Sequence, residues 1–507
     1  MKTLLKVFSA SILALCIVTP ALAKESEKTN AFDAVKGAIE ADQKRCEEVI
    51  KAAKKGDRAK LTVLFKEGYN MECSTEHDQK TPLMEAALHG KADAVGFLVS
   101  EAGVDVNRPD ERGKTALMYA AEHDNPKVIK KLRSRKDLDV NAMATFSVKK
   151  DNKLAKDNEQ MTALMIAAKK NKKKAVDALL EPTTSHILAP AANANIKDKY
   201  DQTALMLALK AGHQDVVIKL IPATADLNAY DKFGQFPLFV ASAEGRDRVV
   251  KELLKSGRVD INRRDGTIKR QTSLMAASKF DKKDAIIPLV SAGADVNAVS
   301  GDGRTALLFA AEENKEDAML ALLAAPGIDV NVQIENPIMD QLKYNGDDKK
   351  KEMAKRGKTA LMFAAERGKK AVVSSLLGKD INLNLQDYRD RTALMHAAAH
   401  GKVDVMRLLL QHKGDLSATI NARDKKDGKT ALILAVEKIH GNNKTMIVDE
   451  LLTVPGIDKD IRDNKGKAAV DHTKKKETVA LLDPSRAAKM PDTPDEEDGV
   501  FASADND

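Results

Sequence analysis

The fold is decided by the stretch Thr392-Ala393-Leu394-Met395-His396-Ala397-Ala398-Ala399-His400-Gly401, because close copies of it recur along the chain. Two of these copies are Thr115–Ala121 and Thr359–Ala365, and looser copies begin at Thr81, Thr162, Thr203, Phe236, Thr272, Thr305 and Thr430. Successive copies start 33 to 54 residues apart. A shortest spacing near 33 residues with some longer steps indicates one helical unit repeated along the chain, with insertions at particular joints.

Each position of the stretch suits a short helix that packs against the next copy. The threonine can accept a backbone hydrogen bond at the start of the helix. The leucine and the small alanine pair lie on one helical face, where alanine permits close approach of a neighbour. A Gly, Asp or Asn then stops the helix, as at Gly90, Asp124, Asn171, Gly212 and Gly401.

A second apolar helix follows each copy, as in Val403–Leu410, and a turn such as Gly293-Ala294-Asp295-Val296-Asn297-Ala298 leads to the next unit. This order resembles the ankyrin repeat, whose consensus contains T-P-L-H-x-A-A and G-A-D-V-N-A. The resemblance covers about residues 40–482. It implies an all-α solenoid of about ten motif-bearing helix-turn-helix repeats, with degenerate caps at both ends.

The chain departs from the family consensus at one position in every copy. Where the family usually has His after the leucine, this chain has an apolar residue. We therefore expect the family's hydrogen bond from that His to the turn to be missing and to be replaced by apolar packing. The residues at this position are Met84, Met118, Met165, Met206, Phe239, Met275, Leu308, Met362, Met395 and Ile433.

Composition also favours stacked repeats over a single globule. Charged residues make up 31% of the 507 residues, whereas aromatic residues make up only 4% and tryptophan is absent. Thin helices held by Leu, Val and Ala do not need large rings, and a stack can grow with chain length. The net charge of +8 is spread over many short helices. We therefore expect a solvated surface and no nucleic-acid groove, which would gather cations and aromatic rings along one stripe.

Residues 1–23 have the organisation of a secretory signal peptide. Lys2 and Lys6 form a positive start, a short apolar run follows, and Ala21-Leu22-Ala23 is a small-residue cleavage site. The apolar run is too short to span a bilayer. Cys16 admits a lipoprotein interpretation, but the preceding Leu15 is larger than such sites prefer. We expect simple cleavage, an exported mature chain, and a polar leader over residues 24–41.

The predicted solenoid covers residues 42–482 and begins with a cap repeat over about residues 42–73. This cap holds the only two cysteines of the mature chain: Cys46 just before its first helix and Cys73 just after its second. Antiparallel helices bring those ends together, and an exported protein meets an oxidising compartment. A disulfide there would add about 3 kcal/mol in the chain-entropy model. Two small buried thiols are the alternative, and the sequence leaves both open.

Two charged insertions, residues 143–157 and 334–356, fall between an Asp-Val-Asn phrase and the following helix. In ankyrin-like folds this joint is the turn that projects beside the concave face. Long loops in a compact scaffold are either functional or disordered, and both interpretations stay open for these two. Residues 483–507 are rich in Asp, Glu and Pro, and we expect an acidic disordered tail there.

The sequence lacks the motifs of common catalytic sites, including a P-loop, His-Glu-x-x-His and Gly-x-Ser-x-Gly. The best metal candidate is His396 with His400, one helical turn apart. No third ligand lies at metal-site spacing, and other repeats fill the His396 position with Tyr119 or Phe363. We therefore expect a packed pair, with no metal, no cofactor and no catalytic residues.

The variable positions of the repeats lie at the end of each first helix. In ankyrin-like proteins these positions line the concave groove. Side chains that change in size and charge on a repeated rigid scaffold suit recognition of another protein. The candidate binding residues are Leu88, His89, Glu122, His123, Lys169, Lys170, Lys210, Glu244, Lys279, Phe280, Glu312, Glu313, Glu366, Arg367 and His400.

These observations predict an exported, monomeric, non-enzymatic module of the periplasm or the extracellular space, which binds a partner protein through its concave face and inserted loops. A secreted effector that acts on a host or competitor cell is the alternative, because the signal segment does not distinguish the two. A metal-dependent enzyme is the third hypothesis. The identity of the partner is not encoded in a recognisable way.

Overall fold

The structure is a computed structural model that describes residues 25–144, 148–150, 153–155, 160–182, 189–335, 346–412, 416, 418–440 and 442–491. The predicted signal segment and residues 492–507 of the predicted acidic tail lie outside these residues. The chain divides into two compact units, Met1–Asp226 and Leu227–Asp507, which are here called unit 1 and unit 2. No described helix is both long and apolar enough to cross a lipid bilayer.

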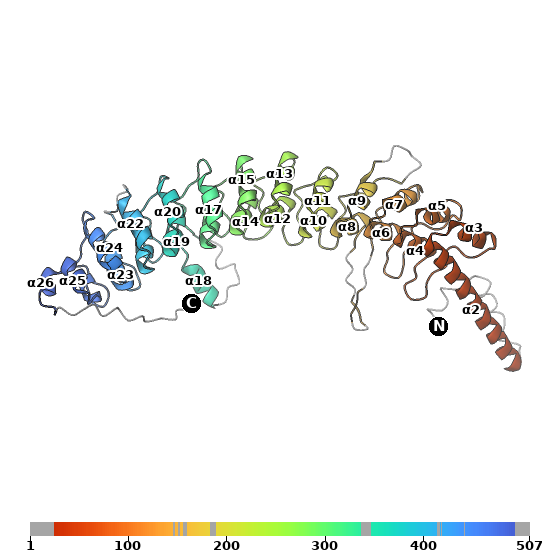
Figure 1. Cartoon of the computed structure of the whole chain (residues 1–507), viewed down its shortest axis with the longest axis horizontal. Coiled ribbons are helices and arrows are strands. Elements are labelled where there is room, and N and C mark those ends of the chain that lie inside the picture. Colours follow the sequence, from red (N-terminus) through yellow and green to blue (C-terminus); the bar gives the residue numbers. More distant parts are fainter. Residues whose placement is uncertain are drawn as a thin grey trace. The chain divides into compact units, whose positions relative to one another are not determined.

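Unit 1 is a stack of helix pairs that follows a cap of two helices, α2 (Glu25–Lys55) and α3 (Arg58–Lys66). The first helices of the pairs pack in one row and the second helices in another, as Figure 1 shows. The first helices are α4 (Pro82–Leu88), α6 (Ala116–Glu122), α8 (Ala163–Lys169) and α10 (Ala204–Lys210). The second helices are α5 (Ala92–Ser100), α7 (Pro126–Leu132), α9 (Lys173–Leu180) and α11 (Gln214–Leu220).

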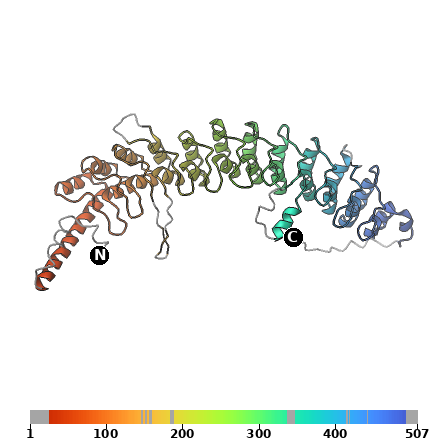
Figure 2. The same cartoon turned by 180° about the vertical axis from the view of Figure 1, so that it is seen from behind.

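Unit 2 repeats this two-row arrangement, which is also visible from behind in Figure 2. Its first helices are α12 (Pro237–Ala243), α14 (Ser273–Lys279), α16 (Ala306–Glu312), α19 (Ala360–Arg367), α21 (Ala393–Ala399) and α23 (Ala431–Lys438). Its second helices are α13 (Asp247–Lys255), α15 (Lys283–Ser291), α17 (Glu316–Leu323), α20 (Lys370–Leu377), α22 (Val403–Gln411) and α24 (Asn442–Leu452). The unit ends in η2 (Ala469–His472), α25 (Lys476–Leu482) and α26 (Pro484–Ala487). The predicted all-α solenoid is confirmed in both units.

The repeated stretch folds as its residue types predict. The leucine of each copy is at most 3% exposed, since it packs between the two rows of helices. The threonine accepts a hydrogen bond from the backbone N–H three residues later in eight copies. These eight are Thr81, Thr162, Thr203, Thr272, Thr305, Thr359, Thr392 and Thr430.

The methionine after the leucine does more than fill space. In four copies its sulfur accepts a hydrogen bond from the backbone N–H of the capping threonine, at 3.3 to 3.5 Å. A thioether is a weak acceptor, and here it takes the place that Glu or Gln holds in a capping box. The expectation of purely apolar packing is therefore corrected for Met84, Met165, Met275 and Met362.

The predicted helix stops are confirmed by the backbone. Gly90, Asp124, Asn171, Gly212 and Gly401 all have φ between 57° and 81°. This left-handed conformation suits Gly and is tolerated by Asp and Asn, whose short polar side chains bond locally.

Neighbouring repeats are joined by the loop that precedes each first helix, here called the finger loop, such as residues 229–236 before α12. In unit 2 the backbone N–H of Gly266 donates to the carbonyl of Gly234 at 2.8 Å, and that of Asn464 donates to Asp427 at 2.8 Å. The Asn of the Asp-Val-Asn phrase adds a side-chain bond to the next repeat, as Asn297 accepts from the N–H of Asp329 at 2.8 Å. These bonds set the spacing of the repeats.

A glycine pair tests how much the contact between finger loops matters. Gly234 and Gly257 both have positive φ, +74° and +65°. A Cβ on Gly234 would lie 2.9 Å from backbone atoms of Gly266, whereas a Cβ on Gly257 would meet nothing within 4 Å. Gly257→Ala should cost only the left-handed conformation, about 1–2 kcal/mol. Gly234→Ala should cost about 1–3 kcal/mol more, because the two loops must separate. Urea unfolding of both variants measures the difference, and equal costs would contradict a tight loop contact.

The N-terminal cap differs from the prediction in one respect. Helix α2 runs from Glu25 to Lys55 without a break, so the predicted polar leader over residues 24–41 is continuous with the first helix of the cap from Glu25 onward. Cys46 therefore lies inside this helix, while Cys73 lies in the turn region beyond α3. Their Cα atoms are 5.7 Å apart and the two residues form a disulfide in the structure, at a separation that is usual for such bonds.

Whether the protein in its native compartment carries this disulfide remains a prediction. Mass spectrometry without reduction should find a peptide that links Cys46 to Cys73. Reduction should increase amide hydrogen exchange in α2 and α3, since it removes a constraint of about 3 kcal/mol from the cap. More distant repeats should exchange as before, because each repeat of a solenoid leans only on its neighbours. Free thiols in protein isolated under alkylating conditions would contradict the prediction.

The two insertions contain regular structure in their described parts. Strands β1 (Val148–Lys150) and β2 (Lys153–Ala155) form an antiparallel hairpin in the first insertion. In the second, α18 (Gly346–Met353) includes the three consecutive lysines Lys349–Lys351. The α18 helix lies on the side of the first helices, below α19 in Figure 1.

Candidate functional site

All fifteen predicted binding residues lie in the last turn of a first helix or at the position that caps it. Because successive first helices pack together, the predicted residues of each unit follow one row of helix ends. In unit 1 they are Leu88, His89, Glu122, His123, Lys169, Lys170 and Lys210, on α4 to α10. In unit 2 they are Glu244, Lys279, Phe280, Glu312, Glu313, Glu366, Arg367 and His400, on α12 to α21.

The fifteen side chains in this row differ in exposure. Half-buried positions are Leu88, Glu122, Lys279, Glu312, Glu366 and Arg367, and the other nine are exposed. Phe280 stands out, because its ring is at the end of α14 and 50% exposed. An exposed phenyl ring on a helix end surrounded by charged neighbours is a typical contact point for a partner.

The half-buried glutamates are anchored to the preceding finger loop. In four repeats the cation directly before the capping threonine pairs with a glutamate eight residues later, at 2.5 to 2.6 Å. The pairs are Lys114–Glu122, Arg304–Glu312, Lys358–Glu366 and Lys429–Glu437. The sequence analysis did not predict this pairing, although each of these four copies has a Lys or Arg before the Thr and a Glu eight residues after that cation. These glutamates therefore hold a finger loop to its helix before they contact any partner.

Glu122 shows the strength of this anchoring. Burial raises the pKa of its carboxyl, but hydrogen bonds from Lys114 and Lys170 outweigh that effect and bring the pKa down to about 2. Lys170 comes from the following repeat, at the end of α8. Two of the predicted binding residues thus neutralise one another across neighbouring repeats.

Arg367 has a role that the sequence did not predict. Its guanidinium donates to the carbonyls of Ala311 and Glu312, both at 2.7 Å. These carbonyls lie in the last turn of α16, where the regular helical donors four residues later are missing; the Ala311 carbonyl also accepts the N–H of Asn314 at 3.2 Å. Arg367 therefore ties α16 to α19, and its replacement would disturb the scaffold as well as the surface.

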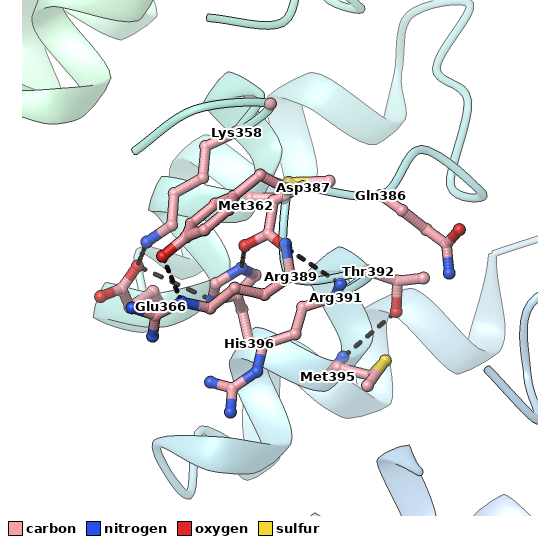
Figure 3. A network of polar contacts seen from close by, with 12 residues as sticks. Lys358, Met362, Glu366, Gln386, Asp387, Arg389, Arg391, Thr392, Met395 and His396 are labelled. Carbon is pink, nitrogen blue, oxygen red and sulfur yellow. Dashed lines mark hydrogen bonds and ion pairs between the residues drawn. The ribbon is translucent and has the colours of Figure 1, made fainter. Parts of the chain in front are cut away.

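A buried polar network connects the next finger loop to α21, as Figure 3 shows. One oxygen of Asp387 accepts the backbone N–H groups of Arg389 and Arg391, at 2.8 and 3.0 Å. The other oxygen lies 2.9 Å from Nε2 of His396. The Asp387 side chain is only 1% exposed. Although burial alone raises its pKa, the bonds from His396 and from the backbone hold the pKa of this carboxyl below its ordinary value.

The same arrangement recurs with different chemistry. The Tyr119 hydroxyl donates to Asp110 at 2.6 Å, and Nε2 of His472 lies 3.0 Å from Asp463. In each case the partner follows the aspartate by nine positions, on α6, α21 or η2. This position therefore serves to lock the finger loop, and either an imidazole or a phenol can do so.

His396 and His400 were the best metal candidates in the sequence. His396 is 3% exposed and bonded to Asp387. Nδ1 of His400 contacts the carbonyl of His396 at 2.9 Å. Within the described ranges, no group of three or more His, Cys, Asp or Glu side chains could hold a metal ion. The Nδ1 atom of His396 has no hydrogen-bond partner and lies 3.8 Å from the carboxylate of Glu366.

The buried imidazole of His396 should make the fold sensitive to acid. Burial and the nearby charge of Lys358 lower the pKa of this imidazole, and these effects outweigh Asp387 and Glu366, which raise it. The unfolded chain therefore binds the proton first, so the stability of the fold should fall as the pH drops through about 6.5. His396→Tyr should remove this slope of at most about 1.4 kcal/mol per pH unit, because tyrosine stays neutral and Tyr119 already bonds Asp110 in this way.

Urea unfolding at pH 7.5 and 5.5 tests this expectation. The carboxyls of Asp387 and Glu366 both have lowered pKa values. Their protonation therefore destabilises the fold only at a pH well below this range. His400→Gln serves as the matched control, since His400 is exposed at the helix end. If His396→Tyr kept the slope of the unmodified protein, His396 would not be its origin.

The second insertion is attached to the row of helix ends by charge. Arg304 has a side chain that is 4% exposed and contacts Asp302, Glu312 and Glu352 at 3.0, 2.6 and 2.6 Å. Lys355 bridges Glu312 and Glu352 at 2.7 and 2.8 Å. Burial lowers the pKa of Arg304, but the surrounding carboxylates outweigh this and raise it. No residue of α18 is itself buried, and Glu352 connects this helix to the ion cluster.

Comparison with known families agrees with this geometry. A family model described as Ankyrin repeats (3 copies) matches residues 49–144, 182–265, 238–334, 332–424 and 378–463. These ranges leave out the segments at both ends and residues 145–181, which contain most of the first insertion and the helices α8 and α9. They cover the other pairs of first and second helices in both units.

Curated relatives match part of this chain. Neurogenic locus notch homolog protein 1 of Xenopus laevis is 35% identical over 131 residues, which are 25% of this chain and 5% of that protein. The protein of the same name from Xenopus tropicalis is 33% identical over 171 residues, 32% of this chain and 7% of that protein. Neurogenic locus notch homolog protein 2 of Homo sapiens is 35% identical over 128 residues, 25% of this chain and 5% of that protein. The matched region thus spans a small fraction of these relatives. Because the family model covers well over half of the chain, the chain belongs to the ankyrin-repeat family.

Proposed function

We propose that this chain is an exported module that binds a partner protein through the ends of its first helices and its inserted loops. Membership of the ankyrin-repeat family indicates a protein–protein interaction module. The proposal assigns the chain no catalytic step, no cofactor and no nucleic acid, and it treats the chain as a monomer. Export is inferred from residues 1–23, and the destination is the periplasm or the extracellular space.

The observation that carries the binding part of the proposal is Phe280. Phe280 is 50% exposed at the end of α14, although Leu274 and the small residues of the same helix are buried. The neighbouring helix ends carry Glu244 and Glu313, which are exposed as well. An apolar anchor with a charged rim is the usual composition of a protein-binding surface.

A photocrosslinking amino acid at position 280 tests this surface in the native cell. The control is the same amino acid at Ile287, which is also 50% exposed but lies on the second helix α15. We expect a specific adduct from position 280 and none from position 287. Phe280→Ser should weaken recovery of the same partner while leaving the helical circular dichroism unchanged. Equal adducts from both positions, or none from position 280, would contradict the assignment of the helix ends.

Fractionation of the native cells tests export separately. The mature protein should begin at Lys24 and should appear in the periplasm or in the culture fluid. Recovery inside a host or competitor cell would favour the alternative of a secreted effector. Retention of an uncleaved chain in the cytoplasm would end the export proposal but leave the binding proposal untouched.

A further inference from the structure

Three consecutive finger loops of unit 2 carry exposed apolar side chains at their tips. Phe233 is 58% exposed, Ile268 is 51% exposed and Val299 is 44% exposed. They precede α12, α14 and α16. The surface formed by residues 230–234, 263–270 and 299–301 is here called the finger ridge. Among the described finger loops of unit 2, these are the ones with exposed large hydrophobic residues.

The finger ridge is held together by bonds between its loops. The Tyr230 hydroxyl donates to the carbonyl of Arg264 at 2.6 Å, which joins the first loop to the second. The backbone N–H of Gly301 donates to the carbonyl of Lys269 at 2.6 Å, which joins the second loop to the third. A Cβ on Gly301 would lie 2.2 Å from the carbonyl oxygen of Ile268. The three tips therefore form an ordered array before any partner arrives, which lowers the entropic cost of binding.

The outward charge of the finger ridge is positive. Its cations are Lys232, Arg263, Arg264, Lys269 and Arg270, of which Lys232, Lys269 and Arg270 are exposed and the other two half-buried.

The carboxylates of the same loops point inward. Asp231, Asp265 and Asp302 are 5%, 8% and 4% exposed. Asp231 accepts the N–H of Phe233 at 2.9 Å, and Asp302 pairs with Arg304 at 3.0 Å. Each carboxylate is thus used to shape its own loop, and the surface left to solvent is apolar and basic.

We infer that the finger ridge binds an acidic polypeptide segment that carries apolar side chains between its carboxylates. This inference rests on the proposed protein-binding function and names the chemistry of the partner. Apolar side chains of the segment would cover Phe233, Ile268 and Val299, and its carboxylates would meet the surrounding cations. Opposite charge would speed association and set the register, while apolar contact would slow dissociation.

Two other classes of ligand suit the finger ridge less well. Single-stranded nucleic acid is bound by stacking of bases on aromatic rings, whereas two of the three tips are aliphatic. A lipid surface is bound by a continuous apolar face, whereas these tips are separated, one per repeat, by polar backbone and glycine. The spacing of one apolar tip per repeat matches side chains that project from an extended or helical polypeptide.

A displayed library of random peptides, panned against the full mature chain, tests the inference. Selected peptides should be enriched in Asp and Glu together with apolar residues. Synthetic copies of them should bind about tenfold more weakly to a Phe233→Ser/Ile268→Ser variant, since about 1.4 kcal/mol corresponds to a factor of ten. They should also bind more weakly to a Lys232→Glu/Lys269→Glu variant, and for the unmodified chain their affinity should fall as salt is raised.

Matched controls come from the second helices of the same repeats. Ile287→Ser removes an aliphatic side chain of nearly the same exposure as Ile268. Lys255→Glu with Lys283→Glu reverses two exposed charges on α13 and α15. Both controls should bind the peptides as the unmodified chain does. Circular dichroism and urea unfolding verify that all variants are folded.

The possible outcomes separate this inference from the proposed function. Enrichment of peptides that are not acidic, or that are insensitive to the finger-ridge variants, overturns the inference and leaves the binding module intact. Failure to enrich any peptide counts against both. Binding of oligo-dT or of phosphatidylglycerol vesicles that is lost in the finger-ridge variants, without a similar loss for peptides, assigns the surface to another class of ligand and also overturns the inference.

Discussion

Asp387→Ala is expected to destabilise the repeat that contains α21 by about 3–5 kcal/mol, the cost of breaking a buried and charged network. The substitution removes the acceptor of two backbone N–H groups and leaves the imidazole of His396 buried without its partner. It also opens the finger loop that contacts the following repeat, through the bond from Lys425 N–H to the carbonyl of Arg389. Urea unfolding should show a lower midpoint, and hydrogen exchange should rise first in α21.

The control for this variant is Asp380→Asn, because the Asp380 side chain is exposed in the preceding turn. It should change stability by no more than about 0.5 kcal/mol. The double variant Asp387→Ala/His396→Leu should recover only part of the loss, since it removes the imidazole that would be buried without its partner but does not restore the acceptor of the Arg389 and Arg391 N–H groups. If Asp387→Ala lowered the free energy of unfolding no more than the control does, the network in Figure 3 would not stabilise the fold.

Arg304→Met is expected to cost about 3–5 kcal/mol and to release α18 from the row of helix ends. Arg304 is the only cation in contact with Asp302, Glu312 and Glu352 together among the described ion pairs. Its removal takes away the cation that these three carboxylates share, while Lys355 still pairs with Glu312 and Glu352. Hydrogen exchange should increase in Gly346–Met353, and a fluorescent label on that helix should rotate more freely.

Arg304→Lys separates the pairing with Glu312, which holds the finger loop, from the pairing with Glu352, which holds α18. Lysine occupies the equivalent position in three other repeats and pairs there with the glutamate eight residues later, as in Lys358–Glu366 at 2.6 Å. This variant should keep the pair with Glu312 and most of the stability, but it should lose the second branch to Glu352 and loosen α18. Lys350→Ala, which removes a side chain that is 82% exposed on the same helix, should do neither. A tightly held α18 in Arg304→Met would refute the role of the ion cluster.

The repeat architecture could be predicted in detail because it is encoded locally. The capping threonine, the buried leucine and the left-handed Gly, Asp or Asn each act within one helical turn. Their recurrence alone also places the fifteen candidate binding residues at first-helix ends. The pattern does not show which of those side chains already bond within the protein, since that depends on residues eight positions away or in another repeat. Arg367, for example, donates to a carbonyl of α16, and Glu122 pairs with Lys170.

Other features were visible in the sequence only in part. The sequence predicts apolar packing for the methionine after the leucine, because the bond from the capping threonine to its sulfur depends on the backbone geometry of the helix start. The sequence predicts a separate leader after residue 24, because nothing in the polar segment marks its continuity with α2. The sequence does not decide the structure of the second insertion, since Glu352 on α18 pairs with an arginine 48 residues earlier.

The sequence by itself determined the repeat, its capping residues, its buried face and the row of first-helix ends that carries the candidate binding residues, because each of these follows from side chains a few residues apart. Only the tertiary structure decided which charged residues pair with one another inside the protein and how α18 is attached. It also decided that Phe233, Ile268 and Val299 are exposed on adjoining finger loops whose carboxylates are buried. These depend on contacts between loops about 30 residues or more apart, and a repeating pattern fixes the spacing of such loops but not the pairing of the side chains they carry.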